Sequence, residues 1–530
     1  MNEQCASPTP HRVPRRTFLK LGAAAATFGA LGACASASLA PSRAVGAAAP
    51  GSRPNIIFIN TDDLDRASLT TMPKVKSLMT DSGTTFTSFF LNVSLCCPSR
   101  SSFLRGQYAQ NTQVLTNGGA NGGYERVHAL GIENSTIATW LQAAGYHTGL
   151  MGKYLNGYPK GATDTFVPPG WNEWYGAVGS GGYKEFDYQL NENGKLVSYG
   201  KAPQDYLTDV LAGKAADFIT RATQDTQPFF LYIPTFAPHQ PATPSPKYAG
   251  AFADAKAPRP PSYNEQDVSD KPQWVQHLPL LNTQEQARLD ELYRNRDRTL
   301  QSVDDLVERV VNTLQTVGAL DNTYIVFSSD NGFHLGEHRE TSGKQAPYEE
   351  DIRVPLIVRG PGIAAGKTVD ALVGNVDFAP TFAEWAGATV PDFVDGRSFT
   401  AFLNGNTPQT WRQTFLLEHY TQDGGAKKAK KPGKNAAPKK QAPGTPAVKT
   451  AHGIPTFQGL RAGSYVYVEY ETNEKELYDL TKDPDELQNI AATADPALLG
   501  QLSARLAAIK MGKGAAFRAA EEQAMPSLPA

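Results

Sequence analysis

The run Asn55-Ile56-Ile57-Phe58-Ile59 is bounded by Pro54 on one side and by the polar residues Thr61-Asp62-Asp63 on the other. A short apolar run between a proline and polar residues predicts a buried β-strand, here with two carboxylates at its carboxyl end. The same pattern recurs at residues 229–233 and at residues 324–327, and polar residues again follow both runs.

Helical patterns lie between these predicted strands, at residues 137–144 and 291–317, and residues 354–358 add a further apolar run. Apolar strands that alternate with helices predict an α/β fold with a large, mostly parallel sheet flanked by helices. Sheets of this kind carry their sites at the carboxyl ends of the strands. We therefore expect the polar residues that follow the strands to form one site.

The C-terminal part of the chain shows a different pattern. Short apolar segments at residues 414–418 and 464–470, with a helical segment that begins within residues 486–492, predict a small antiparallel α+β subdomain packed on the main domain. Residues 424–449 consist mainly of Lys, Ala, Pro and Gly, a composition that predicts a disordered insert. The insert is either a tolerated low-complexity segment or an element that attracts an anionic polymer.

Length and composition exclude several classes of protein. A chain of 530 residues exceeds what one hydrophobic core usually supports, so a large domain with a smaller one is expected. The 40% of hydrophobic and 19% of charged residues are typical of a soluble globular protein. The net charge of -2 gives no reason to expect nucleic acid as a partner. Beyond the N-terminal segment no apolar run approaches the ~20 residues that span a bilayer.

The N-terminal segment has the pattern of an export signal. Arg15-Arg16-Thr17-Phe18-Leu19-Lys20 is a twin-arginine signature, and the alanine-rich residues 21–33 follow it. Residues 31–34, Leu-Gly-Ala-Cys, resemble a bacterial lipoprotein cleavage box, which would make Cys34 a lipidated first residue. Ordinary cleavage between residues 40 and 49 is the alternative. The expected location is therefore extracellular, periplasmic or lipid-anchored at the cell surface.

Only four cysteines occur, and Cys96 and Cys97 are the two that lie outside the N-terminal segment. Adjacent cysteines rarely form an ordinary disulfide bond. Residues 95–106, Leu-Cys-Cys-Pro-Ser-Arg-Ser-Ser-Phe-Leu-Arg-Gly, resemble the signature of the sulfatase family, Cys-x-Pro-Ser-Arg followed by Leu-x-Gly. In that family, part of the alkaline-phosphatase-like superfamily, the first cysteine is oxidised to formylglycine (3-oxoalanine), whose hydrated aldehyde is the nucleophile. The resemblance places Cys96 in that role and Cys97 at the variable position.

The resemblance extends over most of the chain and implies further site residues. Residues 146–153 resemble the segment with a sulfate-binding lysine, and residues 237–241 resemble the segment with a histidine beside the leaving group. Residues 330–337 match the second metal-binding strand end. The implied catalytic residues are Cys96, Arg100, Lys153, His239 and Lys344, and the implied metal ligands are Asp62, Asp63, Cys96, Asp330 and Asn331.

The implied metal ligands favour one calcium ion. Carboxylate and amide oxygens suit a hard cation such as Ca²⁺, whereas a thiolate is a soft ligand that suits zinc or copper better. A cysteine within an oxygen set is therefore a chemical mismatch. Conversion of Cys96 to a gem-diol removes this mismatch, because a diol oxygen suits calcium and the metal favours its ionised form.

One departure from the family pattern follows Lys153, where many sulfatases have Trp-His and this chain has Tyr154. The run Gly-Lys-Tyr-Leu-Asn at residues 152–156, with residues 167–174 after it, is similar to the N-acetylglucosamine-6-sulfatase branch, which acts on sulfated glycosaminoglycans. The aromatic residues Trp171, Trp174 and Tyr175 either stack on a sugar ring or pack in the core.

The resemblance implies a sulfuric ester hydrolase that acts on a sulfated sugar such as N-acetylglucosamine-6-sulfate. It also implies a formylglycine-generating enzyme that modifies Cys96 before export. Two alternatives stay open: a phosphodiester or phosphonate hydrolase of the same superfamily, and a non-catalytic glycan-binding lipoprotein. We expect an export signal and linker at residues 1–49, a sulfatase catalytic domain at 50–408, the C-terminal subdomain at 409–515 and a tail at 516–530.

Overall fold

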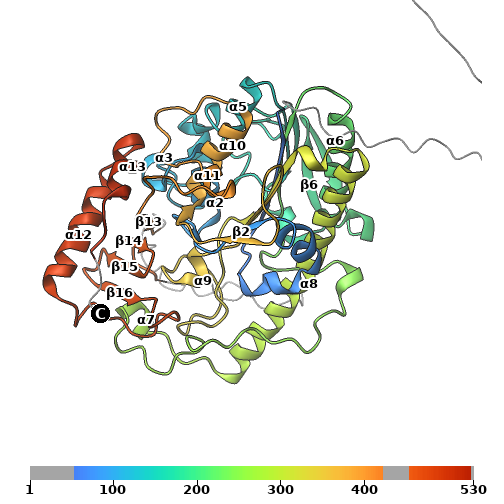
Figure 1. Cartoon of the computed structure of the whole chain (residues 1–530). Helices are drawn as coiled ribbons and strands as arrows, with labels where there is room; N and C mark the ends of the chain where they lie inside the picture. The colour runs from blue at the N-terminus through green and yellow to red at the C-terminus, as the bar shows by residue number, and fades with distance from the viewer. Residues whose placement is uncertain (1–52, 422–452, 527–530) are drawn as a thin grey trace, which may run out of the picture. The chain divides into compact units, whose positions relative to one another are not determined.

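The computed structural model describes residues 53–421 and 453–526. The expected export signal, with Arg15, Arg16 and Cys34, and the expected insert at residues 424–449 lie outside the described residues. Among the helices that are described, none combines the length and the apolar character needed to cross a membrane. The described residues contain a large sheet flanked by helices and a smaller sheet near the C-terminus (Figure 1).

The large sheet has ten strands in the order β11-β2-β10-β9-β1-β8-β4-β5-β6-β7. In this order the strands are β11 (Lys367–Val369), β2 (Thr84–Phe86), β10 (Leu356–Arg359), β9 (Thr323–Ser329), β1 (Asn55–Thr61), β8 (Phe229–Pro234), β4 (His147–Gly152), β5 (Glu173–Val178), β6 (Tyr188–Glu192) and β7 (Lys195–Tyr199). The neighbours β9, β1, β8, β4 and β5 are parallel, whereas β10, β6 and β7 form antiparallel pairs. The predicted α/β fold with a large, mostly parallel sheet is confirmed.

The side chains of β1 alternate between the two faces of the large sheet, so both faces must be covered. Ile56 and Phe58 pack with residues of α2 (Cys96–Arg105), α4 (Gly123–Ala129), α5 (Ile137–Ala143) and α10 (Phe378–Ala386). Ile57 and Ile59 pack with residues of α6 (Leu207–Ala222) and α8 (Thr283–Thr316). Figure 1 shows these two groups of helices on opposite sides of the sheet.

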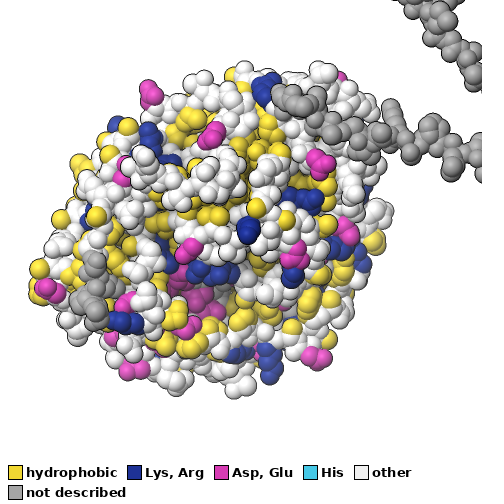
Figure 2. All heavy atoms as spheres, viewed as in Figure 1, with side chains coloured by type: hydrophobic (Ala, Val, Ile, Leu, Met, Phe, Trp, Pro, Cys, Tyr) yellow, Lys and Arg dark blue, Asp and Glu magenta, His cyan; other side chains and the backbone are white. Residues whose placement is uncertain are grey.

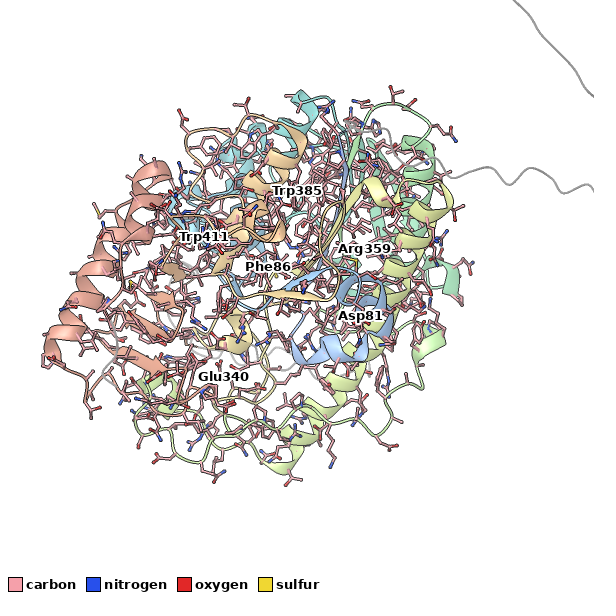
Figure 3. All side chains as sticks on the ribbon, viewed as in Figure 1. Asp81, Phe86, Glu340, Arg359, Trp385 and Trp411 are labelled. Carbon is pink, nitrogen blue, oxygen red and sulfur yellow. The ribbon has the colours of Figure 1, made fainter. Side chains whose placement is uncertain are left out.

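The core on the Ile56 and Phe58 side of the sheet is rich in aromatic rings. Figure 3 marks Phe86 of β2 and Trp385 of α10, and the rings of both lie against Phe399, with centroids 5.2 Å and 6.3 Å away. The remaining helices and the small strand pair are α1 (Pro73–Val75), α3 (Ala109–Thr112), α7 (Gln273–Gln276), α9 (Glu349–Ile352), α11 (Thr400–Leu403), β3 (Phe89–Phe90) and β12 (Val373–Gly374). These short elements fill the connections around the sheet.

The long helix α8 begins before the residues predicted to be helical, 291–317. The side chain of Asn282 accepts hydrogen bonds from the backbone N–H groups of Gln284 and Glu285, and the Glu285 carboxylate accepts one from the Asn282 backbone N–H, which completes a capping box. This cap satisfies backbone donors that a helix otherwise leaves unpaired at its first turn. The helix therefore starts at Thr283.

The smaller sheet consists of β13 (Thr414–His419), β14 (Phe457–Ala462), β15 (Tyr465–Tyr470) and β16 (Lys475–Asp479), all antiparallel, which confirms the predicted C-terminal subdomain. The expected start of a helix within residues 486–492 is wrong. The Asn489 side chain accepts hydrogen bonds from the N–H groups of Leu477 and Ala491 and holds this stretch against β16. The helix α12 (Pro496–Lys510) begins only after the Asp495 cap.

The last described helix, α13 (Gly514–Glu522), lies mostly within residues 516–530, the region expected to be a tail. Phe517 is fully buried and stacks on Tyr108, with ring centroids 4.4 Å apart. Glu521 is also buried and accepts a hydrogen bond of 2.6 Å from the Tyr108 hydroxyl. Helix α13 therefore completes the packing around Tyr108.

A buried cation joins α13 to the rest of the fold. The Arg412 guanidinium binds both carboxylate oxygens of Asp377, and its Nε lies 3.3 Å from Glu521. All three side chains are fully excluded from solvent. Removal of one partner from such a network leaves uncompensated buried charge.

We expect Arg412→Ala to lower the free energy of unfolding by about 3–5 kcal/mol, because Asp377 and Glu521 lose their shared cation. Denaturation in urea, followed by circular dichroism, measures this change. Arg288→Ala, at an exposed position of α8, is the matched control and should change stability little. Equal stability of the two variants would contradict the prediction.

Candidate active site

The strand order of the large sheet brings polar residues from four segments to one edge. Asp62 and Asp63 follow β1, and Asp330 follows β9 directly. Lys153 follows β4, and His239 lies five residues after the end of β8. Because β9, β1, β8 and β4 are neighbours and parallel, their carboxyl ends meet at the same edge.

Cys96 reaches this edge as the first residue of α2. Its thiol hydrogen-bonds to Oδ1 of Asp62 at 3.4 Å, and the Lys344 ammonium lies 2.8 Å from the sulfur. Cys97 differs in its surroundings, since its side chain packs in the hydrophobic core of the sheet. The two adjacent cysteines therefore have separate environments, one polar and one apolar.

The acidic and amide groups at the edge are almost completely buried. Asp62, Asp63, Asp330 and Asn331 are each at most 1% exposed. The Asn331 amide donates to Oδ1 of Asp63 at 2.6 Å, and the Asp63 backbone N–H donates to Oδ1 of Asp330 at 3.2 Å. Buried carboxylates at such separations require neutralising cations.

Three basic side chains supply that neutralisation. Lys153 forms an ion pair with Asp62, Lys344 with Asp63, and Arg100 with Asp330, where Nε and Oδ2 are 2.7 Å apart. Burial on its own raises the pKa of Asp62 and Asp63, but the nearby cations, Lys153 for the first and Lys344 for the second, bring both pKa values below the usual range. The carboxylates of Asp62 and Asp63 are therefore ionised.

The same edge has the donor set for a metal ion. Asp62, Asp63, Cys96 and His239 each offer one ligand atom, and these four atoms lie within 4.8 Å of one another. The Lys344 ammonium contacts Asp63, Cys96 and Oδ1 of Asn331, so a cationic group already lies beside two of these four donors. Of the further residues expected as ligands, Asp330 is paired with Arg100 and Asn331 with Lys344.

His239 forms the more open side of the site, with its side chain 25% exposed. Its Nδ1 lies 2.6 Å from the backbone oxygen of Gln240, so Nδ1 donates a proton there, and Nε2 faces Asp63 at 3.6 Å. A histidine fixed in this way presents Nε2 to the site as the nitrogen that exchanges a proton.

Arg100 has a donor without a partner. Its Nη1 donates to the Lys153 backbone oxygen at 2.8 Å, whereas Nη2 is buried and has no hydrogen-bond partner among the described residues. An unpaired buried guanidinium N–H is costly unless an anionic group accepts from it. The arrangement suits an anion bound beside Cys96, Lys153 and Lys344.

The structure brings all the residues expected in the site together and adds two tyrosines that were not expected. The Tyr183 ring lies 5.0 Å from the Lys153 ammonium and 4.5 Å from the His239 ring. The Tyr232 hydroxyl accepts a hydrogen bond of 3.4 Å from Arg100. Tyr232 lies in a predicted strand that ends at the site, so its position in the sequence could have indicated that it belongs there. Tyr183 belongs to a glycine-rich stretch without a motif, and the sequence gives no such indication for it.

The aromatic residues Trp171, Trp174 and Tyr175, which follow the departure from the family pattern at Tyr154, pack in the core. Trp174 is fully buried, Trp171 is 8% exposed, and both belong to the same core as Tyr154. The Tyr175 ring lies under the Lys214 ammonium, 4.6 Å away. Of the two interpretations of these rings, packing is therefore the one that the structure supports.

Comparisons with known proteins agree with the geometry. The family model described as Sulfatase matches residues 54–388. The N-acetylglucosamine-6-sulfatase of Homo sapiens is 36% identical over 491 residues, which cover 89% of this chain and 87% of the relative. The "Extracellular sulfatase SULF-1 homolog" of Drosophila melanogaster is 39% identical over 69% of this chain and 33% of its own length. The solved structure of BT4656 in complex with its substrate D-glucosamine-2-N,6-O-disulfate has a TM-score of 0.68 at 26% identity, covering 86% of this chain and 97% of that one.

In protein whose Cys96 is unmodified, we expect both thiols to resist iodoacetamide at pH 8 while the protein is folded. Burial raises the pKa of Cys96 to about 12 and that of Cys97 to about 11. A thiol with a pKa of about 12 has a thiolate fraction on the order of 10⁻⁴ at this pH, and the thiolate is the reactive form.

Mass spectrometry of the two-cysteine peptide, before and after denaturation, measures the reaction. Both cysteines should react fully once the chain is unfolded, which serves as the internal control. Fast alkylation of Cys96 in the folded protein would show that the site does not bury this thiol.

Proposed function

The chain belongs to the sulfatase family and is a sulfuric ester hydrolase, and from this premise we propose that it removes sulfate from a sugar such as N-acetylglucosamine-6-sulfate, with oxidised Cys96 as nucleophile. The substrate class rests on the human relative, which is named an N-acetylglucosamine-6-sulfatase, and on BT4656, whose substrate is a glucosamine disulfate. The observation that carries the proposal is the position of Cys96, whose sulfur lies between the Lys344 ammonium and the Asp62 carboxylate.

The surroundings of Cys96 suit an oxygen nucleophile better than a thiol. Burial raises the thiol pKa to about 12, so the unmodified side chain is a weak nucleophile at neutral pH. Oxidation of Cys96 to formylglycine would supply a gem-diol oxygen in its place. Lys344, 2.8 Å from the sulfur, lies where it stabilises an ionised oxygen.

The metal that we propose is a single calcium ion. Asp62, Asp63, Asp330 and Asn331 would hold it with hard oxygen donors, together with the modified Cys96. The fit rests on the contacts of Lys344, because a cation already lies among Asp63, Asn331 and Cys96. When bound, calcium would neutralise charge on the sulfate oxygens and favour the ionised diol.

Arg100, Lys153 and Lys344 bind and orient the sulfate group in this proposal. Attack on an anionic ester by another anion is slow unless the combined charge is neutralised, and fixed cations do this without reorganisation. The unpartnered Nη2 of Arg100 is a donor for a sulfate oxygen. Tyr183 supports the arrangement, since its ring packs on both Lys153 and His239.

His239 donates the proton that the departing alcohol needs. Its partly exposed position lies on the side of the site that a sugar can approach, and its Nε2 faces the reacting groups. The residue directly after Lys153 is Tyr154, which packs in the core. No histidine next to Lys153 therefore shares this task. The leaving oxygen of a sugar has a high pKa and leaves poorly without protonation.

We also propose export of the enzyme through the twin-arginine signature Arg15-Arg16, after a formylglycine-generating enzyme has modified Cys96. The support is the sequence pattern and the fruit-fly relative, which is named an extracellular sulfatase. The mature protein would begin either at a lipidated Cys34 or at a site between residues 40 and 49.

The nucleophile is tested with two matched substitutions. Cys96→Ala should reduce turnover of a sulfated sugar to the limit of detection, whereas Cys97→Ala should keep most of it, because only the first sulfur lies at the site. Mass spectrometry of the active wild type should show formylglycine at Cys96. Similar losses in both variants, or an active protein with unmodified Cys96, would contradict the assignment.

The role of His239 is tested by the leaving group. Loss of a positioned general acid typically costs about 10²–10⁴-fold in rate. We expect His239→Ala to lose this factor in kcat/KM on a sulfated sugar and much less on nitrophenyl sulfate, whose phenolate leaves without a proton. A fall by the same factor on both substrates would show that His239 binds sulfate or supports the structure instead.

A further inference from the structure

A second group of possible metal ligands lies outside the active-site group. It joins His338, from the connection between β9 and α9, with Glu350 of α9 and Glu486, which follows β16. Each of the three offers one ligand atom, and these atoms lie within 4.8 Å of one another. The cluster therefore connects the main domain with the C-terminal subdomain.

His338 is held as metal-binding histidines are usually held. The residue is 1% exposed, and its Nδ1 lies 2.8 Å from Oε2 of Glu265. A carboxylate at Nδ1 fixes the tautomer with the proton there and leaves the lone pair of Nε2 free. Nε2 has no hydrogen-bond partner among the described residues.

The two glutamates follow the same scheme, in which one oxygen is held and the other is free. Oε2 of Glu486 accepts from the Glu349 backbone N–H at 2.9 Å, and Oε1 of Glu350 accepts from the Ser262 hydroxyl at 3.5 Å. Oε1 of Glu486 and Oε2 of Glu350 are buried and have no partner within the part of the chain that is described. Buried polar atoms normally have hydrogen-bond partners. Three atoms without one, each on a different residue of the cluster, therefore indicate that a binding partner is missing.

The charges around the cluster agree with a cationic partner. Burial raises the pKa of Glu350 and of Glu486, and neighbouring carboxylates, Glu337 for the first and Glu349 for the second, add to the effect. Burial also lowers the pKa of His338, which keeps the imidazole neutral. A divalent cation would stabilise both carboxylates and bind the neutral imidazole.

An open cavity of about 640 Å³ reaches one member of the cluster, Glu350, and is also lined by Glu337, Glu349 and Pro484, among others. Figure 2 shows acidic side chains gathered in a hollow of the surface at the place that α9 occupies in Figure 1. Glu340, labelled in Figure 3 on the same side, adds another buried carboxylate nearby. The cavity thus brings solvent to Glu350, one residue of the cluster.

We propose that His338, Glu350 and Glu486 bind a divalent transition-metal ion of the zinc type, separate from the metal of the active site. One imidazole nitrogen and two carboxylate oxygens form a mixed donor set that zinc accepts and that calcium, which prefers oxygen alone, does not. A water molecule from the cavity would complete a tetrahedral site.

The position of the site indicates its role. His338 lies between Asn331 and Lys344, in the segment that carries both residues to the active site. A metal bound to His338 and Glu486 would link this segment to the C-terminal subdomain. The ion is thus a structural link that positions Lys344.

Metal content tests the proposal directly. Full-length protein, purified without chelator, is dialysed against Zn²⁺ with an excess of Ca²⁺, and bound metals are measured by inductively coupled plasma mass spectrometry. We expect one zinc ion per chain in the wild type and none in His338→Gln or Glu486→Gln. His277→Gln, at an exposed histidine, is the matched control and should keep its zinc. Asp63→Asn should also keep it, which separates this site from the active site.

Two further measurements do not depend on whether a ligand variant folds. Wild-type protein loaded with Co²⁺ should show the intense visible absorption of four-coordinate cobalt. Glu265→Gln, which changes the carboxylate that contacts both His338 and Lys271, should weaken zinc binding by about 10–100-fold in a calorimetric titration. Equal zinc content in wild type and His338→Gln would overturn the proposal. So would a wild type without zinc and without a cobalt spectrum, which would identify the cluster as carboxyl groups that share a proton.

Discussion

The active site depends on the neutralisation of buried negative charge at one edge of the large sheet. Asp62, Asp63 and Asp330 are almost fully excluded from solvent, and each is paired with a different basic side chain. These cations come from α2, from the end of β4 and from the segment before α9, so the pairing holds together parts of the chain that are far apart in sequence. Folding of the sheet and assembly of the site are therefore coupled, because the carboxylates can be buried only when the basic side chains are in place to neutralise them.

Much of this arrangement could be predicted from the sequence, because it follows from local patterns. The apolar runs that precede Asp62 and Asp330 predict buried strands, and parallel strands bring their carboxyl ends to one edge. The Cys96 signature adds the nucleophile position through resemblance to a family. The sequence pattern also indicates the antiparallel C-terminal sheet, since short apolar segments alternate with turns in this part of the chain.

The remaining features could not be predicted because they depend on contacts between distant segments. The contact of Tyr183 with Lys153 and His239 depends on where a glycine-rich loop folds back, and no periodicity indicates that. Residues 486–492 have helix-forming composition, but the Asn489 side chain holds them against β16. The expected tail contains a helix because Phe517 and Glu521 find a pocket around Tyr108, more than 400 residues away.

The pocket around Tyr108 has a consequence for the order of events during biosynthesis. Glu521 is synthesised more than 400 residues after Tyr108, yet it completes the buried contacts of Arg412 and of Tyr108, which follows α2 by three residues. The region around α2 therefore reaches its final packing only after α13 has been made. Cys96, the first residue of α2, is fully buried in the finished fold. Under the modification of Cys96 proposed above, a modifying enzyme would have to act before the docking of α13 completes the packing of this region.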